Sequence, residues 1–596
     1  MIITVIPLIK LPRNLVYFDY EISPDISIDK YSLVIVPWRK TKIFALVVDN
    51  KKSQLKAKIN LKKIIKPVNQ GRPIATPTQF KLIDQLAKDF LTSPSIWWKN
   101  LLPQFPKKSE INLTNIEKNK LIENKIKNNH KMKLELSNSF DDMVASLISK
   151  INKDDQQLIL CPELVDIDIL YKKIPLELKQ VTAIYHKGLK NKELINNYFK
   201  ILNNEVKIII GTKLSFLLPF HNLKTIYVFK SENYGFSSNS QNPRYNLDSI
   251  YNYLNKFYQA NIILYSFSPW VDTYAYFKKE KQEITDKQMP LNFKLIDMTL
   301  EKKANNFSYL SWPLEQAIKN TLNTNKKCLL LVNRKGYKQK LYCQDCGWSP
   351  SCEQCGGYLK LKDFNSLQCG ICQTAYPVPE ICPHCKSVRL KNYGLTNQIL
   401  VENLKKIFQQ KQIVFVDNEN KFLPDNSKIV VATKYFVSHL KNDFGLIAFI
   451  DADQELVTYN FRSFELAWQF FNNAFRMLAD CQKFVQTKKA DHYLWDYLLN
   501  YSYHKFWLKE MSWRKKMNFP PYSKIIKLII KKVNENKNKT TVGQIISKLS
   551  CNFIKFISIN NLEIVFSFPA DKYKDVYKIL SKLPEYIIIE FNPYEI

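Results

Sequence analysis

Residues 181–210 read VTAIYHKGLKNKELINNYFKILNNEVKIII. The segment holds two short apolar runs, Val181–Tyr185 and Val206–Ile210, and the helix-like stretch Asn191–Leu202 lies between them. An uninterrupted apolar run of this length is typical of a strand that is buried on both faces. Two such runs with a helix between them predict a strand–helix–strand unit of a parallel sheet.

The same pattern continues on both sides of this segment. From about residue 132, apolar runs alternate with amphipathic stretches such as Asn246–Tyr258, and a second series follows after residue 300. Two α/β lobes in tandem are the architecture of superfamily 1 and 2 nucleic-acid motors, although a fold does not establish a function. The remaining runs are Gln157–Cys161, Thr225–Phe229, Asn261–Leu264, Lys327–Val332, Gln412–Val416, Lys428–Val431, Leu446–Ile450 and Lys483–Gln486.

Four CxxC pairs interrupt the second series. A CxxC turn brings two thiolates to one metal ion, and two such turns complete a closed tetrahedral zinc site. We therefore predict two structural Zn²⁺ ions per chain, with an iron–sulfur cluster as the main competitor. The spacing favours a nested arrangement, and we expect His384 to lie at the surface. The inner pairs are Cys352/Cys355 and Cys369/Cys372, and the outer pairs are Cys343/Cys346 and Cys382/Cys385.

The chain is strongly basic. Its 88 Lys and Arg residues exceed its 54 Asp and Glu residues by a formal charge of +34. This excess favours a polyanionic partner, nucleic acid first and an anionic membrane second. The alternative is a composition bias, because Lys, Asn, Ile, Tyr and Phe are abundant together, as an AT-rich genome would produce. Hydrophobic residues make up 45% of the chain, which excludes a disordered protein.

Membrane and nucleotide signals are both missing from the sequence. No apolar run reaches the roughly 18 residues that span a bilayer, and the opening MIITVIPLI has no basic leader. We therefore expect a cytoplasmic, reduced chain with no membrane partner. Glycine is scarce, at 12 of 596 residues, and neither GxxxxGK[ST] nor GxGxxG occurs. A phosphate loop needs glycines so that backbone N–H groups can close around the anion, so a conventional nucleotide loop is absent.

The cysteine-rich segment resembles the zinc insert of the PriA family of replication restart proteins (primosomal protein N′). The resemblance rests on NRKGY (333–337), LYCQDCGW (341–348), SCEQCGGYL (351–359) and LQCGICQTAYPVPEICPHCKS (367–387). It extends over nearly the whole chain, with further matches in the family's order. These are Cys161–Glu163, His186–Leu189, Gly211–Lys213, Pro219-Phe220, Asp451–Asp453, Asn460–Ser463 and Phe519–Ser523.

The resemblance implies an α/β fold with two tandem RecA-like helicase lobes and a two-zinc insert in the second lobe. It also implies a small, mostly β N-terminal domain and a small α+β C-terminal domain. We expect an N-terminal domain over residues 1–104, a linker over 105–131, a first lobe over 132–300, a second lobe over 301–342 and 390–508, a zinc-binding insert over 343–389 and a C-terminal domain over 509–596.

The nucleotide motifs of the family are eroded in this chain. The phosphate-loop segment aligns with Leu136–Asp142, where Asp141 and Asp142 replace the expected Lys and Thr. Two anions thus stand where the family places a phosphate-binding cation and a Mg²⁺-ligating hydroxyl. The family's Asp-Glu-Glu-His becomes Phe229–Glu232, and its last motif, which normally ends Gly-Arg-Ala-Gly-Arg, becomes Phe475–Asp480. We expect that ATP turnover is lost, that no catalytic residue remains and that the lobes serve as a scaffold.

The N-terminal region resembles the family's module that captures the 3′ end of a nascent strand. Phe18, Asp19, Tyr20 and Lys62 fit that pattern and are the candidate DNA-binding residues. An aromatic ring can stack on a terminal base, a carboxylate can accept hydrogen bonds from a 3′-OH, and a lysine can pair with phosphate. The alternative is that Phe18 and Tyr20 simply alternate on a half-buried strand. Arg39 stands where the family places glycine.

The resemblance implies a DNA-binding protein of replication restart without helicase activity of its own. Its expected partners are forked or branched DNA, single-stranded DNA, primosome proteins that reload the replicative helicase, and single-stranded DNA-binding protein. One alternative is an active 3′→5′ ATP-dependent helicase with a rearranged nucleotide site. The other is a zinc-ribbon scaffold that binds nucleic acid outside replication, for instance RNA.

Overall fold

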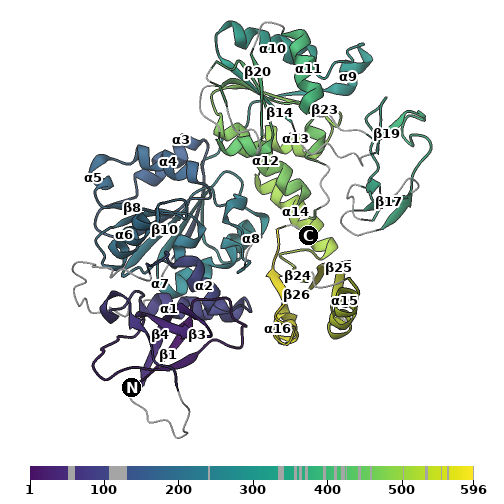
Figure 1. Cartoon of the computed structure of the whole chain (residues 1–596). Coiled ribbons are helices and arrows are strands. Elements are labelled where there is room, and N and C mark those ends of the chain that lie inside the picture. Colours follow the sequence, from purple (N-terminus) through teal and green to yellow (C-terminus); the bar gives the residue numbers. More distant parts are fainter. Residues whose placement is uncertain are drawn as a thin grey trace.

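The computed structural model describes most of the chain (Figure 1). The described residues are 1–51, 61–106, 131–238, 242–332, 341–354, 359–361, 366–369, 374–392, 397–408, 412–417, 423–424, 426–439, 444–456, 460–500, 503–530, 535–551, 553–559 and 563–594. Most of the expected linker, residues 107–130, lies outside them.

The N-terminal domain is an antiparallel five-stranded sheet with two helices, in the strand order β2-β1-β4-β3-β5. The first helix begins at a capping box, in which the Thr76 hydroxyl accepts from the Gln79 N–H and the Gln79 side chain accepts from the Thr76 N–H. The expected mostly β N-terminal domain is therefore observed, and two helices follow its sheet. Its elements are β1 (Ile2–Pro7), β2 (Phe18–Glu21), β3 (Leu33–Trp38), β4 (Thr41–Lys51), β5 (Lys66–Pro67), α1 (Pro77–Asp89) and α2 (Pro94–Leu101).

The first lobe is a seven-stranded parallel sheet of order β12-β6-β11-β10-β7-β9-β8. Residues 181–210 form β8, α6 and β9 with the loops between them, and β8 pairs with β9 in parallel register. Helix α6 has the bounds predicted from the sequence. The strands are β6 (Met132–Leu136), β7 (Gln156–Leu160), β8 (Thr182–Tyr185), β9 (Ile208–Gly211), β10 (Leu223–Val228), β11 (Asn261–Ser266) and β12 (Glu283–Asp286), and the helices are α3 (Phe140–Ile148), α4 (Leu164–Lys173), α5 (Leu176–Lys179), α6 (Asn191–Leu202), α7 (Tyr251–Tyr258) and α8 (Val271–Lys279).

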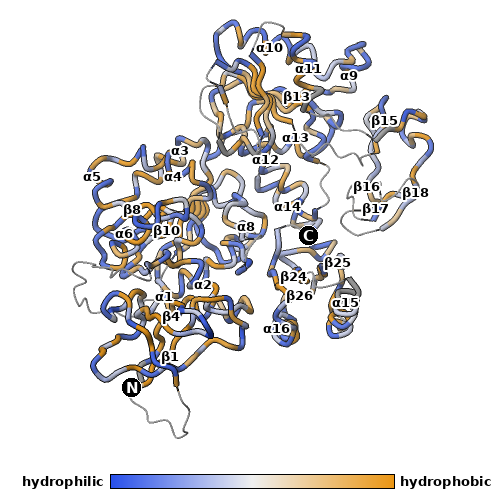
Figure 2. The backbone as a smooth tube through the Cα atoms, in the orientation of Figure 1, coloured by the Kyte–Doolittle hydropathy of each residue, from blue (hydrophilic) through white to orange (hydrophobic). Residues whose placement is uncertain are grey.

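The second lobe has a six-stranded parallel sheet of order β13-β23-β22-β14-β21-β20. The tube in Figure 2 is hydrophobic at the centre of this lobe, as expected for strands with helices on both sides. The predicted pair of parallel α/β lobes is thereby confirmed. The strands are β13 (Lys294–Asp297), β14 (Lys327–Leu331), β20 (Ile413–Val416), β21 (Ile429–Ala432), β22 (Phe444–Phe449) and β23 (Gln482–Thr487), and the helices are α9 (Met298–Lys303), α10 (Trp312–Asn323), α11 (Asn397–Ile407), α12 (Ser463–Met477), α13 (Tyr493–Leu499) and α14 (Tyr503–Met517).

Two expected domain boundaries differ from the structure. Strand β13 pairs with β23 of the second lobe, so the lobes divide before residue 294 and not at residue 300. The boundary at residues 508/509 falls inside α14, which continues to Met517. In both places the sequence carries a weak local signal: β13 is only four residues long, and nothing in α14 interrupts a helix.

The insert and the C-terminal domain complete the chain. The insert has the antiparallel pair β15-β19 and the antiparallel sheet β16-β17-β18, and the C-terminal sheet has the order β25-β26-β24-β27. In the part of the chain that is described, no helix is long and apolar enough to cross a membrane. The elements are β15 (Leu341–Cys343), β16 (Leu359–Leu361), β17 (Ser366–Cys369), β18 (Ala375–Pro377), β19 (Leu390–Asn392), β24 (Ser523–Ile530), α15 (Glu535–Leu549), β25 (Lys555–Ile559), β26 (Glu563–Pro569), α16 (Tyr573–Ser581) and β27 (Ile587–Phe591).

Candidate functional site

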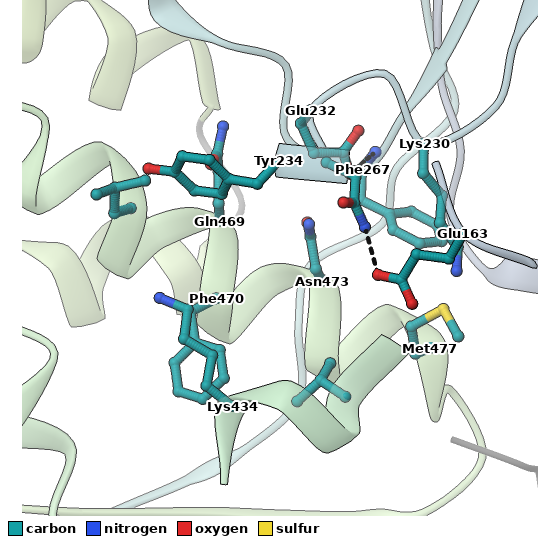
Figure 3. Close-up of a pocket in the computed structure, with 13 residues that line it drawn as sticks. Glu163, Lys230, Glu232, Tyr234, Phe267, Lys434, Gln469, Phe470, Asn473 and Met477 are labelled. Carbon is teal, nitrogen blue, oxygen red and sulfur yellow. Dashed lines mark hydrogen bonds between the residues drawn. The ribbon is translucent and has the colours of Figure 1, made fainter. Parts of the chain in front are cut away.

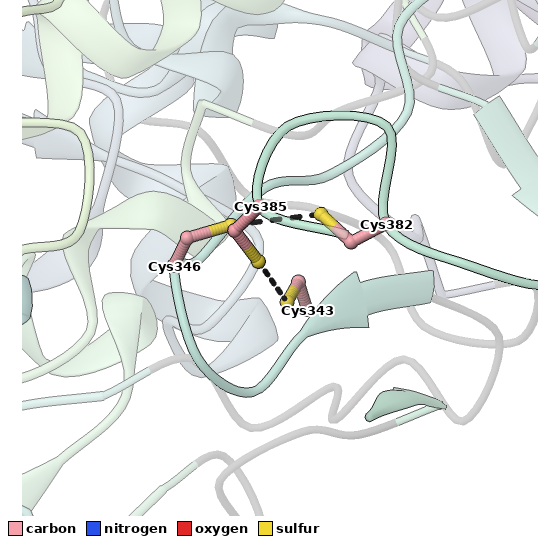
Figure 4. A group of neighbouring side chains, drawn as sticks. All are labelled: Cys343, Cys346, Cys382 and Cys385. Atoms are coloured by element: carbon pink, nitrogen blue, oxygen red, sulfur yellow. Dashed lines mark hydrogen bonds between the residues drawn. The ribbon is translucent and has the colours of Figure 1, made fainter. Parts of the chain in front are cut away.

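The outer cysteines of the insert converge on one point (Figure 4). The sulfurs of Cys343, Cys346, Cys382 and Cys385 all lie within 4.8 Å of one another. The Cys343 and Cys385 sulfurs are 3.5 Å apart, and the Cys346 and Cys382 sulfurs are 3.6 Å apart. This grouping is the outer site of the nested arrangement. Four thiols at these separations could hold a metal ion, and a four-sulfur tetrahedral set suits zinc.

The two turns that carry these cysteines have the same backbone geometry. The N–H of Gly347 donates to the Cys343 carbonyl over 3.0 Å, and the N–H of Lys386 donates to the Cys382 carbonyl over 2.9 Å. Gly347 and Lys386 have φ values of +75° and +61°. Glycine adopts this conformation freely, whereas a lysine does so at a cost. The antiparallel pair β15-β19 joins the turns, with Cys343 opposite Leu390.

The thiols of the cluster have unequal affinities for the proton. Burial raises the pKa of the Cys346 thiol to about 12. Burial also acts on Cys343, but hydrogen bonds from the backbone of Cys346 and Asp345 outweigh it and lower the pKa of that thiol to about 7. Without a cation, four adjacent thiolates would repel one another. A divalent metal would remove this repulsion and deprotonate the remaining ligands.

The inner cysteines are only partly described. Cys355 and Cys372 lie outside the described residues, so the inner site remains a prediction. Cys352 and Cys369 are both buried. Between the inner pairs, β16 and β17 pair antiparallel, with Leu359 opposite Cys369. His384 is exposed and is not part of the outer cluster.

The first turn of α3, in the first lobe, carries acidic residues. After β6, the Ser139 hydroxyl caps α3 by accepting from the Asp142 N–H. Asp141 and Asp142 occupy the first turn and are exposed. Carboxylates at a helix N-terminus interact favourably with the helix dipole and stabilise the helix. The same negative charges would repel a phosphate at this position. Asp141 forms an ion pair with Lys173 at the end of α4.

An aromatic pair and a buried ion pair pack together at the end of β10. The ring centroids of Phe140 and Phe229 are 5.8 Å apart, in an edge-to-face contact. The Lys230 Nζ lies 5.1 Å from the Phe140 centroid and 2.6 Å from Asp166 Oδ1. The side chains of Lys230 and Asp166 are 7% and 0% exposed. This cation therefore neutralises a carboxylate of its own lobe. Sequence reasoning missed this pair because its residues are distant in the chain.

The second-lobe side presents Arg476, which lies on α12 and is buried. Its Nη1 donates to Asn138 Oδ1 over 2.8 Å and to the Asn138 carbonyl over 3.0 Å. Its Nη2 donates to the Met289 carbonyl over 2.9 Å. The guanidinium therefore lies against the loop between β6 and α3, which contains Asn138. The structure gives Arg476 a structural role instead of that of a free arginine finger.

A cavity of about 300 Å³ remains between the lobes (Figure 3). It contains two lysines and two glutamates, so its lining has no excess of positive charge. Each lysine also has a carboxylate nearby, since Lys434 Nζ lies 3.3 Å from Glu455 Oε2 and Lys230 pairs with Asp166. Such a lining offers little to a triphosphate. The lining residues are Glu163, Lys230, Glu232, Asn233, Tyr234, Phe267, Lys434, Val437, Leu466, Gln469, Phe470, Asn473 and Met477.

The four N-terminal candidates lie on or beside β2. Asp19 is exposed, and its Oδ1 accepts from the Thr4 hydroxyl over 2.7 Å. Phe18 is half-buried, with its ring centroid 4.8 Å from that of Trp38. Lys62 is exposed, and its carbonyl accepts from the Glu21 N–H, which places residue 62 beside β2. Asp19, Phe18 and Lys62 therefore share one edge of the sheet.

Tyr20 differs from the other three candidates. Its side chain is 5% exposed, and its hydroxyl donates to the Pro37 carbonyl over 3.1 Å. The ring belongs to the core of the N-terminal sheet. Tyr20 therefore fits the alternative in which the aromatic residues of this strand serve the packing of the sheet.

Arg39 lies in the tight turn between β3 and β4, which pair with Trp38 opposite Thr41. Its φ is +51°, in the left-handed region that glycine adopts without a steric penalty. This geometry explains a preference for glycine at this position. The Arg39 side chain is exposed, so it adds a cation to the same domain.

Comparisons with known proteins show what the chain is similar to. Residues 8–103 match the model of the PriA 3′DNA-binding domain (3′BD). The replication restart protein PriA of Borreliella burgdorferi is 28% identical over 419 residues, which cover 66% of this chain and 63% of that protein. PriA of Bacillus subtilis is 24% identical over 433 residues, which cover 68% of this chain and 53% of that protein.

The chain therefore spans only 53% to 63% of the length of these two curated relatives. Among solved structures, Dbp5 of S. cerevisiae bound to RNA and ADP BeF3 is similar, with 10% identity and a TM-score of 0.34 over 74% of this chain and 98% of that chain.

Proposed function

Because the chain is related to the replication restart protein PriA, we propose that it binds forked or branched DNA and acts in replication restart in the cytoplasm. It would recruit the primosome proteins that reload the replicative helicase, together with single-stranded DNA-binding protein. The match of residues 8–103 to a 3′DNA-binding domain carries this proposal. The exposed edge formed by Asp19 and Lys62 supports it, because a carboxylate and an ammonium are the groups that a 3′-OH and its phosphate require.

We propose two zinc ions per chain, and both would be structural. The outer four-cysteine cluster supports the first ion. The hairpin that carries Cys369 next to Leu359 supports the second. A closed site with four protein ligands leaves no open position for a water or a substrate. The insert would therefore contribute a rigid surface for DNA or partner proteins.

The chain would work without hydrolysing ATP. Phosphoryl transfer depends on positioning and on charge stabilisation of the triphosphate. The first lobe instead offers exposed carboxylates at Asp141 and Asp142. The lysine after β10 is paired with Asp166, and the guanidinium of Arg476 is held by Asn138. Each missing electrostatic donor costs a factor of roughly 10²–10³ in rate.

One preparation tests the proposal with two assays. Fork binding is measured by fluorescence anisotropy with and without Mg·ATP, and ATP cleavage is measured in single turnover on the same forks. We expect tight binding that ATP leaves unchanged and that weakens steeply with salt. A double variant, Asp141→Asn with Asp142→Asn, is the control for divergent catalysis. ATP cleavage that disappears in this control would establish the alternative, an active helicase.

RNA separates the remaining alternative. Equal affinity for single-stranded RNA and for forks with a free 3′ end would favour a scaffold outside replication. A clear preference for the forks supports replication restart.

A further inference from the structure

Helix α12, which Figure 1 shows on the side of the second lobe that faces the first, contacts the first lobe through its side chains. In a motor, a nucleotide would bridge the lobes at this junction. Arg476 provides three hydrogen bonds across this junction, two to Asn138 and one to the Met289 carbonyl. Its Nε also donates to Asn472 Oδ1, one helical turn earlier, over 3.0 Å. The four bonds use all three guanidinium nitrogens. The orientation of this side chain is therefore fully determined by the two surfaces that it joins.

The preceding turns of α12 contact the next loop of the first lobe. Asn472 Nδ2 donates to the Phe267 carbonyl over 2.8 Å and to the Ser268 hydroxyl over 2.7 Å. Gln469 Nε2 donates to the Ser268 carbonyl over 3.0 Å. Asn472 is fully buried. Positions 469, 472 and 476 follow helical spacing, so they form one polar stripe along α12.

The N-terminal end of α12 contacts the first lobe through a hydrogen bond and an ion pair. Glu465 Oε1 accepts from the Val271 N–H at the start of α8 over 2.5 Å. Arg462 pairs with Asp272 of α8, and it also donates to Glu465 over 2.9 Å. The buried Arg462 and the partly exposed Asp272 thus form an ion pair that spans the lobes. Interrupting such a pair leaves a charge unpaired and out of water.

We propose that α12 is a permanent latch, in which Arg476, Asn472 and Gln469 replace the nucleotide as the bridge between the lobes. In a nucleotide-driven motor, the ligand supplies the contacts that close the cleft, so the lobes move when it leaves. In this chain the same closure is made by amino-acid side chains. The lobes would then hold one arrangement whether or not ATP is present. This inference rests on the proposed loss of ATP turnover and adds a physical consequence to it.

Hydrogen exchange measured by mass spectrometry on the full chain tests the latch. Two amides report on it: Val271, whose N–H is bound across the junction, and Met289, whose N–H donates to Asn138 Oδ1 over 3.0 Å. In the wild-type chain we expect the exchange rate of each amide to be the same with Mg·ATP as without it. Arg476→Ala should speed exchange of the Met289 amide at least roughly tenfold, the factor that about 1.4 kcal/mol represents.

Two further variants make the result decisive. Asn472→Ala removes the contact to Phe267 and Ser268 but no charge, so it covers the case in which Arg476→Ala fails to fold. Lys319→Ala is the control, because Lys319 forms an exposed ion pair with Glu315 within α10 of the second lobe and should not affect the junction amides. Unchanged exchange in both α12 variants, or wild-type exchange that changes on adding Mg·ATP, would overturn the latch. Fork binding measured on the same samples reports separately on the proposed function.

Discussion

Replacing Lys230 with methionine should destabilise the first lobe strongly. Methionine keeps the length of the side chain but removes its charge, and Asp166 is then left unpaired with a side chain that is 0% exposed. Breaking a buried ion pair by removing one partner costs about 3–5 kcal/mol. For a unit of 150–250 residues, each kcal/mol shifts the melting temperature by roughly 2–4 °C, so we expect a fall on the order of 10 °C.

The loss should depend on pH with a defined sign. Burial raises the pKa of Asp166, and the Lys230 charge opposes this rise. Without that charge, the folded-state pKa of the carboxyl rises further above its unfolded value. A group whose pKa is higher in the folded state stabilises the fold at pH values below its unfolded-state pKa. This stabilisation is lost as the pH rises through the folded-state pKa. The variant should therefore be closer to wild type at pH 5 than at pH 8.

Thermal unfolding followed by circular dichroism at both pH values measures this effect. Lys173→Met is the matched control, because the Lys173–Asp141 pair is exposed and should contribute about 0–1 kcal/mol. The double variant Lys230→Met with Asp166→Leu should recover most of the loss, since it removes both charges. If Lys230→Met melts within about 2 °C of wild type at pH 8, the ion pair does not hold the lobe together, and Lys230 would be free for a ligand.

Three further predictions concern other parts of the chain. Elemental analysis should find two zinc ions per chain, and Cys369→Ser should lose one of them while the lobes stay folded, whereas a single zinc in wild type would exclude the second site. Asp19→Ala should weaken binding to forks with a 3′-OH roughly tenfold in fluorescence anisotropy, because a charged hydrogen bond is lost. Binding to forks that end in a 3′-phosphate should change little, and equal losses on both substrates would indicate a structural role for Asp19. Burial raises the pKa of Glu510 to about 7, so the contribution of this carboxyl to stability is lost as the pH rises through 7. Glu510→Gln should therefore raise the melting temperature more at pH 8 than at pH 5, and a larger rise at pH 5 would contradict this pH dependence.

The sequence alone determined the elements whose signals are local. The apolar runs around α6 predicted β8 and β9 and their parallel pairing, because a buried strand and an amphipathic helix each show their own periodicity. The cysteine spacing favoured the grouping of Cys343/Cys346 with Cys382/Cys385, because the first two pairs are separated by only 5 residues, which is tight for two turns that share one ion. The expected erosion of the nucleotide motifs was likewise a prediction from short strings of residues, such as Asp141-Asp142.

Only the tertiary structure decided what each of the other side chains contacts. Tyr20 and Asp19 are neighbours on one strand, yet the sheet buries the first and exposes the second. Lys230 follows β10, and only the packing of α4 against the loop after this strand shows that it neutralises Asp166. Arg476 became an interlobe bridge because α12 folds against a loop that is 338 residues earlier in the chain. Contacts between such distant residues depend on how the sheets and helices pack, and no local pattern of residues records that packing.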